Sequence, residues 1–424
     1  MFTPLFSNYS LDDKINITNL IQIKNNILSH LISNPIDFFS QLQSTSIIGS
    51  NNSNTEICLH LTKENTNIKP LGVRGKIGVP YLFTLQQKQY ILKSSLAKTT
   101  VNISKNPPTL LRSLLSEQTD MLTCQFPPLN DISFYIGLDE FTNEVLIAYI
   151  IDYMMEKINL STYLLHHLGY KCASSTLLGN NIGYNLMEYA DLGTLDQIST
   201  NPRWDPYCDY INNSKRIQPL ILLTILKQLI LTLDYLQQNL HFIHGDGKSA
   251  NIFVSSTPFS FNSSRFHFTS PFTCKLGDFG KSSLTFNHSR LFNYNWLAST
   301  YLYLRPFLPH IENDSYIVSN LNLAELYTHL RHMGFPYYLS FDTYTFILSI
   351  LCDPIFFFTF FDSPVLSHLW TILWYPPDQK LMYTRLLNTM NSHTNSFGSI
   401  LSLLKNIRLK CHATTLLFNE LFLV

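Results

Sequence analysis

A short polar segment constrains the fold of this chain more than any other feature of the sequence. Directly after a long apolar stretch at 220–240, residues 244–251 read His-Gly-Asp-Gly-Lys-Ser-Ala-Asn. A second polar turn, Asp-Phe-Gly, follows at 278–280, and its aspartate comes 27 residues after Asn251. The two turns supply two carboxylates, an amide and an ammonium group. Polar turns of this kind next to an apolar stretch mark both segments as candidate parts of a functional site.

Glycine placement supports this interpretation. The chain has only 15 glycines in 424 residues. Seven of them lie in three short segments: Gly72, Gly75, Gly78, Gly245, Gly247, Gly277 and Gly280. Glycine is favoured where the backbone takes a positive φ or approaches another group closely. The segment at 72–79 is therefore a third candidate part of the site.

In order and spacing, the two polar turns match the HxDxKxxN catalytic loop and the DFG motif of protein kinases. Over roughly 67–424 the chain resembles the eukaryotic-type Ser/Thr protein kinase superfamily, in the style of divergent kinases of large DNA viruses. This resemblance implies an α+β, bilobal protein-kinase-like fold. The small β-rich N-lobe would span 67–190, with an insertion near 99–130, and the larger α-helical C-lobe would span 191–424. Residues 1–66 would form an N-terminal extension, helical at first and ending in a Ser/Asn-rich linker.

The residue pattern gives a similar order of elements. Apolar spacing predicts one or two short helices within 1–43 and a helix over 139–157 with one apolar stripe. Within 69–94 two short β-like runs lie at 81–85 and 89–94, and a strand is expected over 183–189. A strongly apolar helix at 220–240 comes next, and the rest of the chain is expected to be mostly helical.

The resemblance implies a role for each polar residue of the two turns. Asp246 would accept the proton of a substrate hydroxyl, and Lys248 would neutralise charge on the transferring phosphoryl group. Asn251 and Asp278 would hold Mg²⁺ through hard oxygen ligands. ATP and Mg²⁺ are therefore the expected cofactors.

The resemblance also assigns an ATP site to the upstream segments. Its residues would be Gly72, Gly75, Gly78, Val79, Lys93, Glu144, Met187, Glu188 and Ala190. The glycines would cover the phosphates, although the first two stand three apart instead of two. Met187 would be the gatekeeper, and the backbones of the two residues at 188 and 190 would meet the adenine. Lys93 would hold the phosphates and pair with a helix glutamate. Glu144 is the first choice, because it lies in the middle of the expected helix beside its apolar face, and Glu140 is the fallback. A solvated surface position is the alternative for either glutamate.

Three departures from the family pattern concern regulation and substrate docking. Thr300 lies in a segment that resembles the end of an activation segment, but Phe307 replaces its acidic residue, and about 20 extra residues follow. Gly245 stands where the family has an arginine before the catalytic aspartate. We therefore expect little dependence on activation-loop phosphorylation, because no fixed guanidinium rewards the added charge. Asp342 matches the family's buried aspartate that braces the catalytic loop.

Two other classes of function remain open. Small-molecule kinases that phosphorylate aminoglycosides or choline commonly carry His-Gly-Asp, as at 244–246, but Lys248 favours a Ser/Thr protein kinase. A pseudokinase scaffold usually lacks the lysine or one of the two aspartates, whereas Lys93, Asp246 and Asp278 are all present. The leading prediction is an ATP-dependent serine/threonine protein kinase.

Composition limits the classes of partner. Lys+Arg and Asp+Glu number 29 each, so the balance shows no basic surface for nucleic acid. The apolar stretch at 344–361 is interrupted by Asp353 and Pro354, and the first 14 residues lack a secretion signal. We expect no nucleic-acid or membrane partner, reduced thiols, and a viral or host protein as substrate. The location would be host cytoplasm or nucleus, or the virion, and the oligomeric state is left open.

Overall fold

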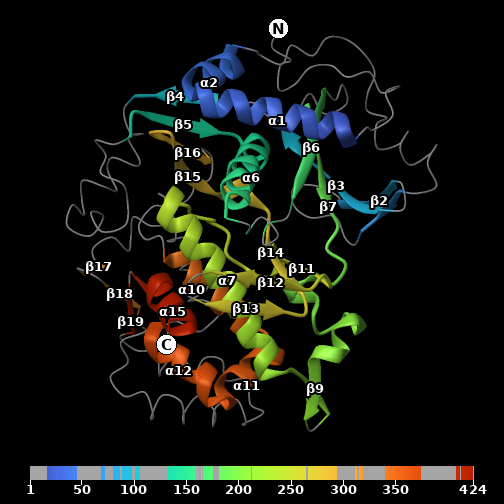
Figure 1. Ribbon diagram of the computed structural model, residues 1–424, viewed down its shortest axis with the longest axis vertical. Coiled ribbons are helices and arrows are strands. Elements are labelled where there is room, and N and C mark those ends of the chain that lie inside the picture. Colours follow the sequence, from blue (N-terminus) through green and yellow to red (C-terminus); the bar gives the residue numbers. More distant parts are fainter. Residues whose placement is uncertain are drawn as a thin grey trace. The chain divides into compact units, whose positions relative to one another are not determined.

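The computed structural model describes residues 17–44, 68–71, 80–85, 88–97, 101–105, 132–158, 160, 164, 166–174, 181–211, 213–263, 266–293, 311–312, 315–318, 340–373, 407–410 and 412–423. The chain divides into two compact units. Unit 1 comprises Met1–Pro107, Ile132–Ala190 and Asp278–Asn295, and unit 2 comprises Pro108–Asp131, Asp191–Gly277 and Trp296–Val424. Helices and strands occur in both (Figure 1), which is compatible with the predicted α+β class.

Unit 1 contains a five-stranded antiparallel sheet in the order β1-β2-β3-β7-β6. Its strands are β1 (Ile68–Pro70), β2 (Pro80–Leu85), β3 (Lys88–Ala97), β6 (His167–Ser174) and β7 (Asn181–Glu188). The predicted runs within 80–95 and at 183–189 are therefore strands. In the register, Lys93 lies opposite Asn185, and Met187 lies between Ile91 and His167.

A second sheet of unit 1 explains why the segment after Asp278 belongs to this unit. It has the order β15-β16-β5-β4, formed by β4 (Val101–Ser104), β5 (Phe134–Leu138), β15 (Ser283–Phe286) and β16 (Ser289–Asn293). The strands β15 and β16 form a hairpin, and β16 pairs in parallel with β5. These backbone pairs tie the segment to strands more than 140 residues earlier in the chain.

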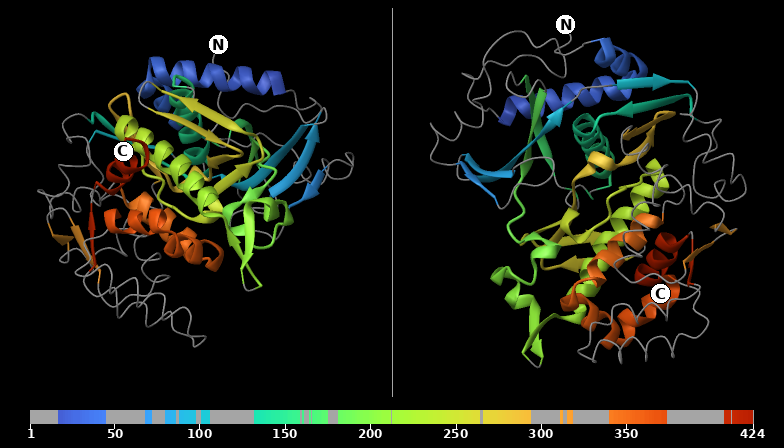
Figure 2. Two further views of the ribbon diagram at one scale, coloured as in Figure 1. Left: turned by 60° about the horizontal axis from the view of Figure 1, so that its bottom comes forward. Right: turned by 180° about the vertical axis from the view of Figure 1, so that it is seen from behind.

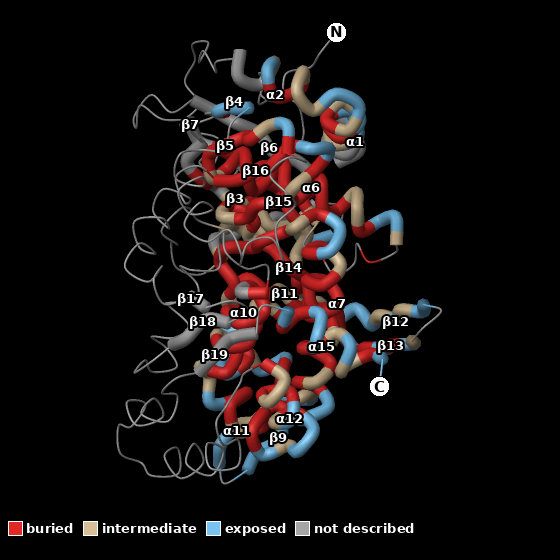
Figure 3. The backbone as a smooth tube through the Cα atoms, turned by 90° about the vertical axis from the view of Figure 1, so that its left-hand side faces the viewer, coloured by how far each residue is buried: buried red, intermediate tan, exposed pale blue. Residues whose placement is uncertain are grey.

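The helix α6 (Glu140–Glu156) begins where the sequence predicts, because the side chain of Asp139 caps it by accepting from the N–H groups of Phe141 and Thr142. The expected single apolar stripe is wrong. The helix is buried on nearly every side (Figure 3), since it contacts β3, β6, β16 and a helix of the N-terminal segment. At Gly183 a side chain would collide with the Phe141 ring, 2.5 Å from an added Cβ, so only glycine permits this approach.

The two helices expected within 1–43 are α1 (Ile17–Ser33) and α2 (Pro35–Ser44). They pack on the rest of unit 1, with α1 against β6 and α6 and α2 against β4 (Figures 1 and 2). Lys24 of α1 forms an ion pair with Asp152 of α6, and Asn287 donates to the carbonyl of Ile32 at 3.0 Å. Phe39 of α2 is fully buried. The N-terminal helices thus contribute to the core of unit 1.

In unit 2, helices surround the apolar helix α7 (Pro219–Leu240). The other α-helices described there are α10 (Phe341–Leu351), α11 (Pro354–Asp362), α12 (Pro364–Leu373) and α15 (Ala413–Phe422). The expectation of a mostly helical chain after 240 is wrong for 252–276, which forms short strands. These are β11 (Ile252–Ser255) and β14 (Thr273–Leu276), which pair with each other and with β8 (Gly193–Thr194), and the hairpin of β12 (Phe259–Asn262) and β13 (His267–Ser270).

Short elements complete the described part of unit 2. The strand pair β9 (Cys208–Ile211) and β10 (Ser214–Ile217) precedes α7, and β17 (Ile311–Glu312), β18 (Ser315–Val318) and β19 (Ile407–Lys410) form a small sheet. Single 3-10 turns are η3 (Leu195–Gln197), η4 (Pro202–Tyr207) and η5 (Ser249–Asn251), whereas η6 (Phe279–Lys281) belongs to unit 1. Cys208, Cys274 and Cys352 are free thiols.

Within the described residues, only α7 is long and apolar enough by itself to cross a membrane. However, 72% of its apolar window is buried inside the protein, as in a core helix. The apolar stretch at 344–361 is bent by 102° between α10 and α11, where Asp353 caps α11 by accepting from the N–H of Ile355.

We predict that Lys24→Met lowers the free energy of unfolding by about 1–3 kcal/mol, because it leaves the buried Asp152 carboxylate without its lysine. Urea denaturation of both proteins measures the difference. The matched control is Lys88→Met, since Lys88 is exposed and its replacement should change stability by less than about 0.5 kcal/mol. Equal stability of the two variants would show that α1 contributes nothing through this ion pair.

Candidate functional site

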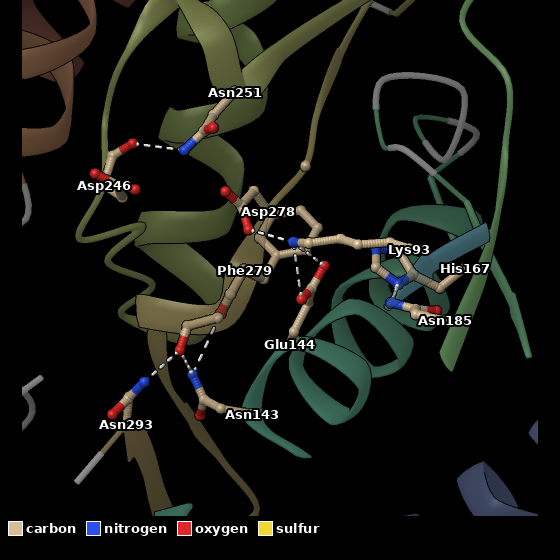
Figure 4. A network of polar contacts seen from close by, with 12 residues as sticks. Lys93, Asn143, Glu144, His167, Asn185, Asp246, Asn251, Asp278, Phe279 and Asn293 are labelled. Carbon is tan, nitrogen blue, oxygen red and sulfur yellow. Dashed lines mark hydrogen bonds and ion pairs between the residues drawn. The ribbon is translucent and has the colours of Figure 1, made fainter. Parts of the chain in front are cut away.

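The polar residues of unit 1 meet at the ammonium group of Lys93, on β3. Its Nζ lies 3.0 and 3.1 Å from the two carboxylate oxygens of Glu144, on α6. The same Nζ lies 2.8 Å from Oδ1 of Asp278 (Figure 4). Of the two glutamates considered from the sequence, Glu144 is thus the one that contacts Lys93, whereas the side chain of Glu140 lies beside Gly280.

Charge and burial act against each other in this cluster. The Lys93 side chain is 23% exposed and that of Glu144 is 4% exposed. Burial alone would lower the pKa of Lys93, but the charges of Asp278 and Glu144 outweigh it and raise that pKa. Burial raises the pKa of Glu144 to about 6, and Asp278 adds to this shift while Lys93 opposes it. Two carboxylates thus share the ammonium group of Lys93.

Asp278 has an unusual backbone conformation. Its φ of 64° and ψ of 61° lie in the left-handed region, which residues other than glycine rarely adopt. Phe279 follows it into the core, where the side chain is 1% exposed and packs against the ring of His167, with 6.1 Å between the centroids. The left-handed residue lets the chain present a carboxylate to Lys93 and bury the next side chain.

In unit 2, the loop after α7 brings three of the predicted residues together. Lys248 Nζ lies 2.9 Å from Oδ2 of Asp246. Asn251, in η5, donates from its amide nitrogen to the backbone carbonyl of Asp246 at 2.9 Å. Asp246 is 3% exposed, so the lysine provides its positive charge in a largely buried setting. The amide nitrogen of Asn251 is used in this way, which leaves its oxygen as the atom for a cation.

The buried Asp342 holds this loop from α10. One carboxylate oxygen accepts from the N–H of His244 at 2.6 Å and the other from the N–H of Gly245 at 3.1 Å. Burial raises the pKa of Asp342 to about 7, although both N–H groups oppose the shift. Gly245 has a φ of 73°, and at Gly247 an added Cβ would lie 2.2 Å from the Thr345 hydroxyl. The positive φ at position 245 and the close packing at position 247 therefore both favour glycine.

The loop also contacts Gly277, at the end of this segment of unit 2. The His244 ring nitrogen Nε2 lies 3.0 Å from the carbonyl oxygen of Gly277, and the N–H of Gly277 donates to the Asn251 carbonyl at 3.2 Å. Asp278 follows Gly277 directly in the sequence. The backbone before Asp278 is therefore anchored to the loop that carries Asp246.

The three residues expected near adenine lie at the end of β7. Met187 is 4% and Ala190 6% exposed. The N–H of Glu188 donates to the carbonyl of His166 at 3.0 Å, and its carboxylate accepts from the N–H of His166 at 2.7 Å. The N–H of Glu188 is thus already used inside unit 1.

Some predicted site residues lie outside the described residues: Gly72, Gly75, Gly78, Val79 and Thr300. In the part of the chain that the structure describes, no group of three or more His, Cys, Asp or Glu side chains could hold a metal ion. The predicted Mg²⁺ ligands, Asn251 and Asp278, offer an amide oxygen and a carboxylate. Both are hard oxygen donors, and Mg²⁺ commonly takes few protein ligands together with phosphate oxygens.

Several polar side chains of this region were not predicted from the sequence. Asn143 and Asn293 donate to the backbone that follows Asp278, and His167 and Asn185 form a buried pair with 2.7 Å between ring and amide nitrogens. No motif marks these residues. The only available signal was a polar pair, Asn143 and Glu144, inside an otherwise apolar helix.

Comparison with known proteins supports a kinase-like family. No protein-family model matches the chain. The chain is 30% identical, over 272 residues, to a protein of Acanthamoeba polyphaga mimivirus named "Putative serine/threonine-protein kinase". The similarity covers 55% of this chain and 37% of that protein, so the chain spans little more than a third of the relative's length.

We predict that Asp342 makes the stability of the protein depend on pH. Its folded pKa of about 7 is above the unfolded value, so its contribution is full at low pH and is lost as the pH rises through about 7. The stability of the wild type relative to Asp342→Asn should fall by about 1–3 kcal/mol between pH 5 and pH 8. Urea denaturation at both pH values measures this, and the other titrating groups cancel in the comparison. A difference that is constant with pH would contradict the prediction.

Proposed function

We propose that this protein is an ATP-dependent serine/threonine protein kinase, in which units 1 and 2 act as the two lobes of a kinase. The observation that carries the proposal is the contact of Lys93 with both Glu144 and Asp278. An ammonium group held by two buried or half-buried carboxylates keeps its charge and its position. That is what binding the phosphates of a nucleotide requires.

ATP and Mg²⁺ are the proposed cofactors. Asp278 and Asn251 would hold Mg²⁺, which neutralises charge on the phosphates when it is bound. Lys93 would contact the α- and β-phosphates, and Glu144 would orient it. The remaining ATP-binding residues of the proposal are Gly72, Gly75, Gly78, Val79, Met187, Glu188 and Ala190.

The chemistry on the substrate would be performed by residues of unit 2. A carboxylate of Asp246 would accept the proton of a serine or threonine hydroxyl. Lys248, whose Nζ lies 2.9 Å from Oδ2 of Asp246, would offer a positive charge to the transferring group. Thr300 is proposed at the end of the activation segment. The substrate would be a viral or host protein, and the kinase itself would be located in the host cytoplasm or nucleus or in the virion.

Two alternatives to a protein kinase are a small-molecule kinase and a pseudokinase without catalytic activity. The His-Gly-Asp sequence at 244–246 would suit a small-molecule kinase of the aminoglycoside or choline type. Lys248 favours a protein kinase, because the chain resembles Ser/Thr kinases in having a lysine at this position. Its Nζ contacts the carboxylate of Asp246. A pseudokinase would need none of these contacts, whereas Lys93, Asp246 and Asp278 all have specific polar partners.

We predict that purified protein transfers phosphate from ATP to a mixed protein pool, and that Asp246→Asn lowers the rate by about 10²–10⁴-fold because the proton acceptor is lost. Radiolabelled phosphate incorporation measures the rate. Asp209→Asn, the same exchange at an exposed position of the same unit, is the matched control and should leave the rate unchanged.

The other outcomes distinguish the alternatives. Equal transfer by the wild type and Asp246→Asn removes the assigned role of Asp246. Transfer to an aminoglycoside or to choline, with none to proteins, would indicate the small-molecule class. Binding without transfer, or no Mg²⁺-dependent nucleotide binding at all, would indicate a scaffold.

A further inference from the structure

Side-chain amides from two other elements hold the turn η6. The amide nitrogen of Asn143, on α6, donates to the backbone carbonyls of Phe279, Gly280 and Ser282 at 3.2, 3.1 and 2.8 Å. The amide nitrogen of Asn293, the last residue of β16, donates to the carbonyl of Gly280 at 2.7 Å (Figure 4). One short turn thus receives hydrogen bonds from a helix and from a strand.

Both asparagines are buried, so their hydrogen bonds restrict which side chains can occupy these two positions. Asn143 is 0% and Asn293 is 2% exposed. Buried carbonyl oxygens need donors, and a tight turn offers them no neighbouring strand. A buried amide is likewise unfavourable unless it is hydrogen-bonded. The amides and the turn therefore depend on each other, and an apolar or acidic side chain of similar size cannot replace the donors.

The turn follows directly on Asp278. A left-handed conformation of a residue with a side chain persists only where the surrounding structure enforces it. On the side chain, the contact with Lys93 at 2.8 Å fixes the carboxylate. On the backbone, the hydrogen bonds to the next residues fix the direction in which the chain leaves Asp278.

We propose that Asn143 and Asn293 are positioning residues, which hold η6 so that the Asp278 carboxylate is presented for Mg²⁺. The proposal rests on the proposed kinase function for the role of Asp278. Asn143 is adjacent to Glu144, so α6 reaches the Asp278 segment in two ways. One is ionic and passes through Lys93, and the other is the amide contact with the backbone. A displacement of α6 would therefore release both.

The decisive variant is Asn143→Asp, which keeps the shape of the side chain but places an oxygen against three carbonyl oxygens. Amide hydrogen exchange over 278–293 should become about 10–100-fold faster, because the turn loses its donors. The Mg²⁺ concentration for half-maximal ATP binding should rise about 10-fold, the usual effect of removing a group that orients a metal ligand. A role confined to stability would not move this Mg²⁺ requirement in the folded protein.

A matched control and a second variant keep the test sharp. Asn239→Asp removes another amide that donates to a backbone carbonyl, that of Tyr235, at an exposed position of α7. It should change neither measurement. If Asn143→Asp does not fold, Asn293→Ser decides, since it removes only one of the two donors to Gly280. It should give a smaller change in the same direction.

The outcomes separate this proposal from the proposed function. If amide hydrogen exchange over 278–293 is unchanged in the variants, the two asparagines do not hold η6. Faster exchange with an unchanged Mg²⁺ requirement overturns the positioning role. If the wild type binds no ATP with Mg²⁺, the kinase function and the role of Asp278 fall together, and the exchange measurement still decides whether the amides hold η6.

Discussion

The structure of unit 1 depends on one shared cation. Lys93 comes from a central strand, Glu144 from the helix α6, and Asp278 from the segment that continues into β15 and β16. Removing the ammonium would leave two carboxylates close together, one of them buried, which is much less favourable than the complete set. Three stretches of chain that are distant in sequence are thus kept together by a requirement of charge.

The polar residues of α6 extend this dependence in several directions. The helix is buried on nearly every side, so each polar group in it must have a partner nearby. Glu144 contacts the sheet, Asn143 contacts η6, and Asp152 contacts Lys24 of α1. Asp152 has a lowered pKa because His166 and Lys24 outweigh its burial. The N-terminal helices are therefore coupled to the same helix that orients Lys93. A change in how α1 packs would act on α6 and through it on the cluster.

The sequence predicts the parts of this arrangement that are local. Asp139 caps α6, the apolar run forms α7, and Glu144 was identified as a partner of Lys93 because it lies in the middle of the helix. The parts that depend on non-local pairing could not be predicted. The parallel pairing of β16 with β5 determines where Asn293 lies, and nothing in the local sequence encodes it. The burial of α6 on all sides likewise follows from α1 and the sheets and not from its own pattern.

The loop of unit 2 is held through its backbone. Asp342 accepts from two consecutive N–H groups, and these groups do not depend on which side chains stand at 244 and 245. What the loop does require is a φ of 73° at position 245, which glycine adopts without strain. An arginine at position 245 would be strained in this conformation, and an ion pair between its side chain and a negative charge would have to offset the strain. With glycine at 245 this strain does not arise, and Asp342 holds the loop through the N–H groups of His244 and Gly245. The expectation of little dependence on activation-loop phosphorylation rests on this glycine and stays a prediction.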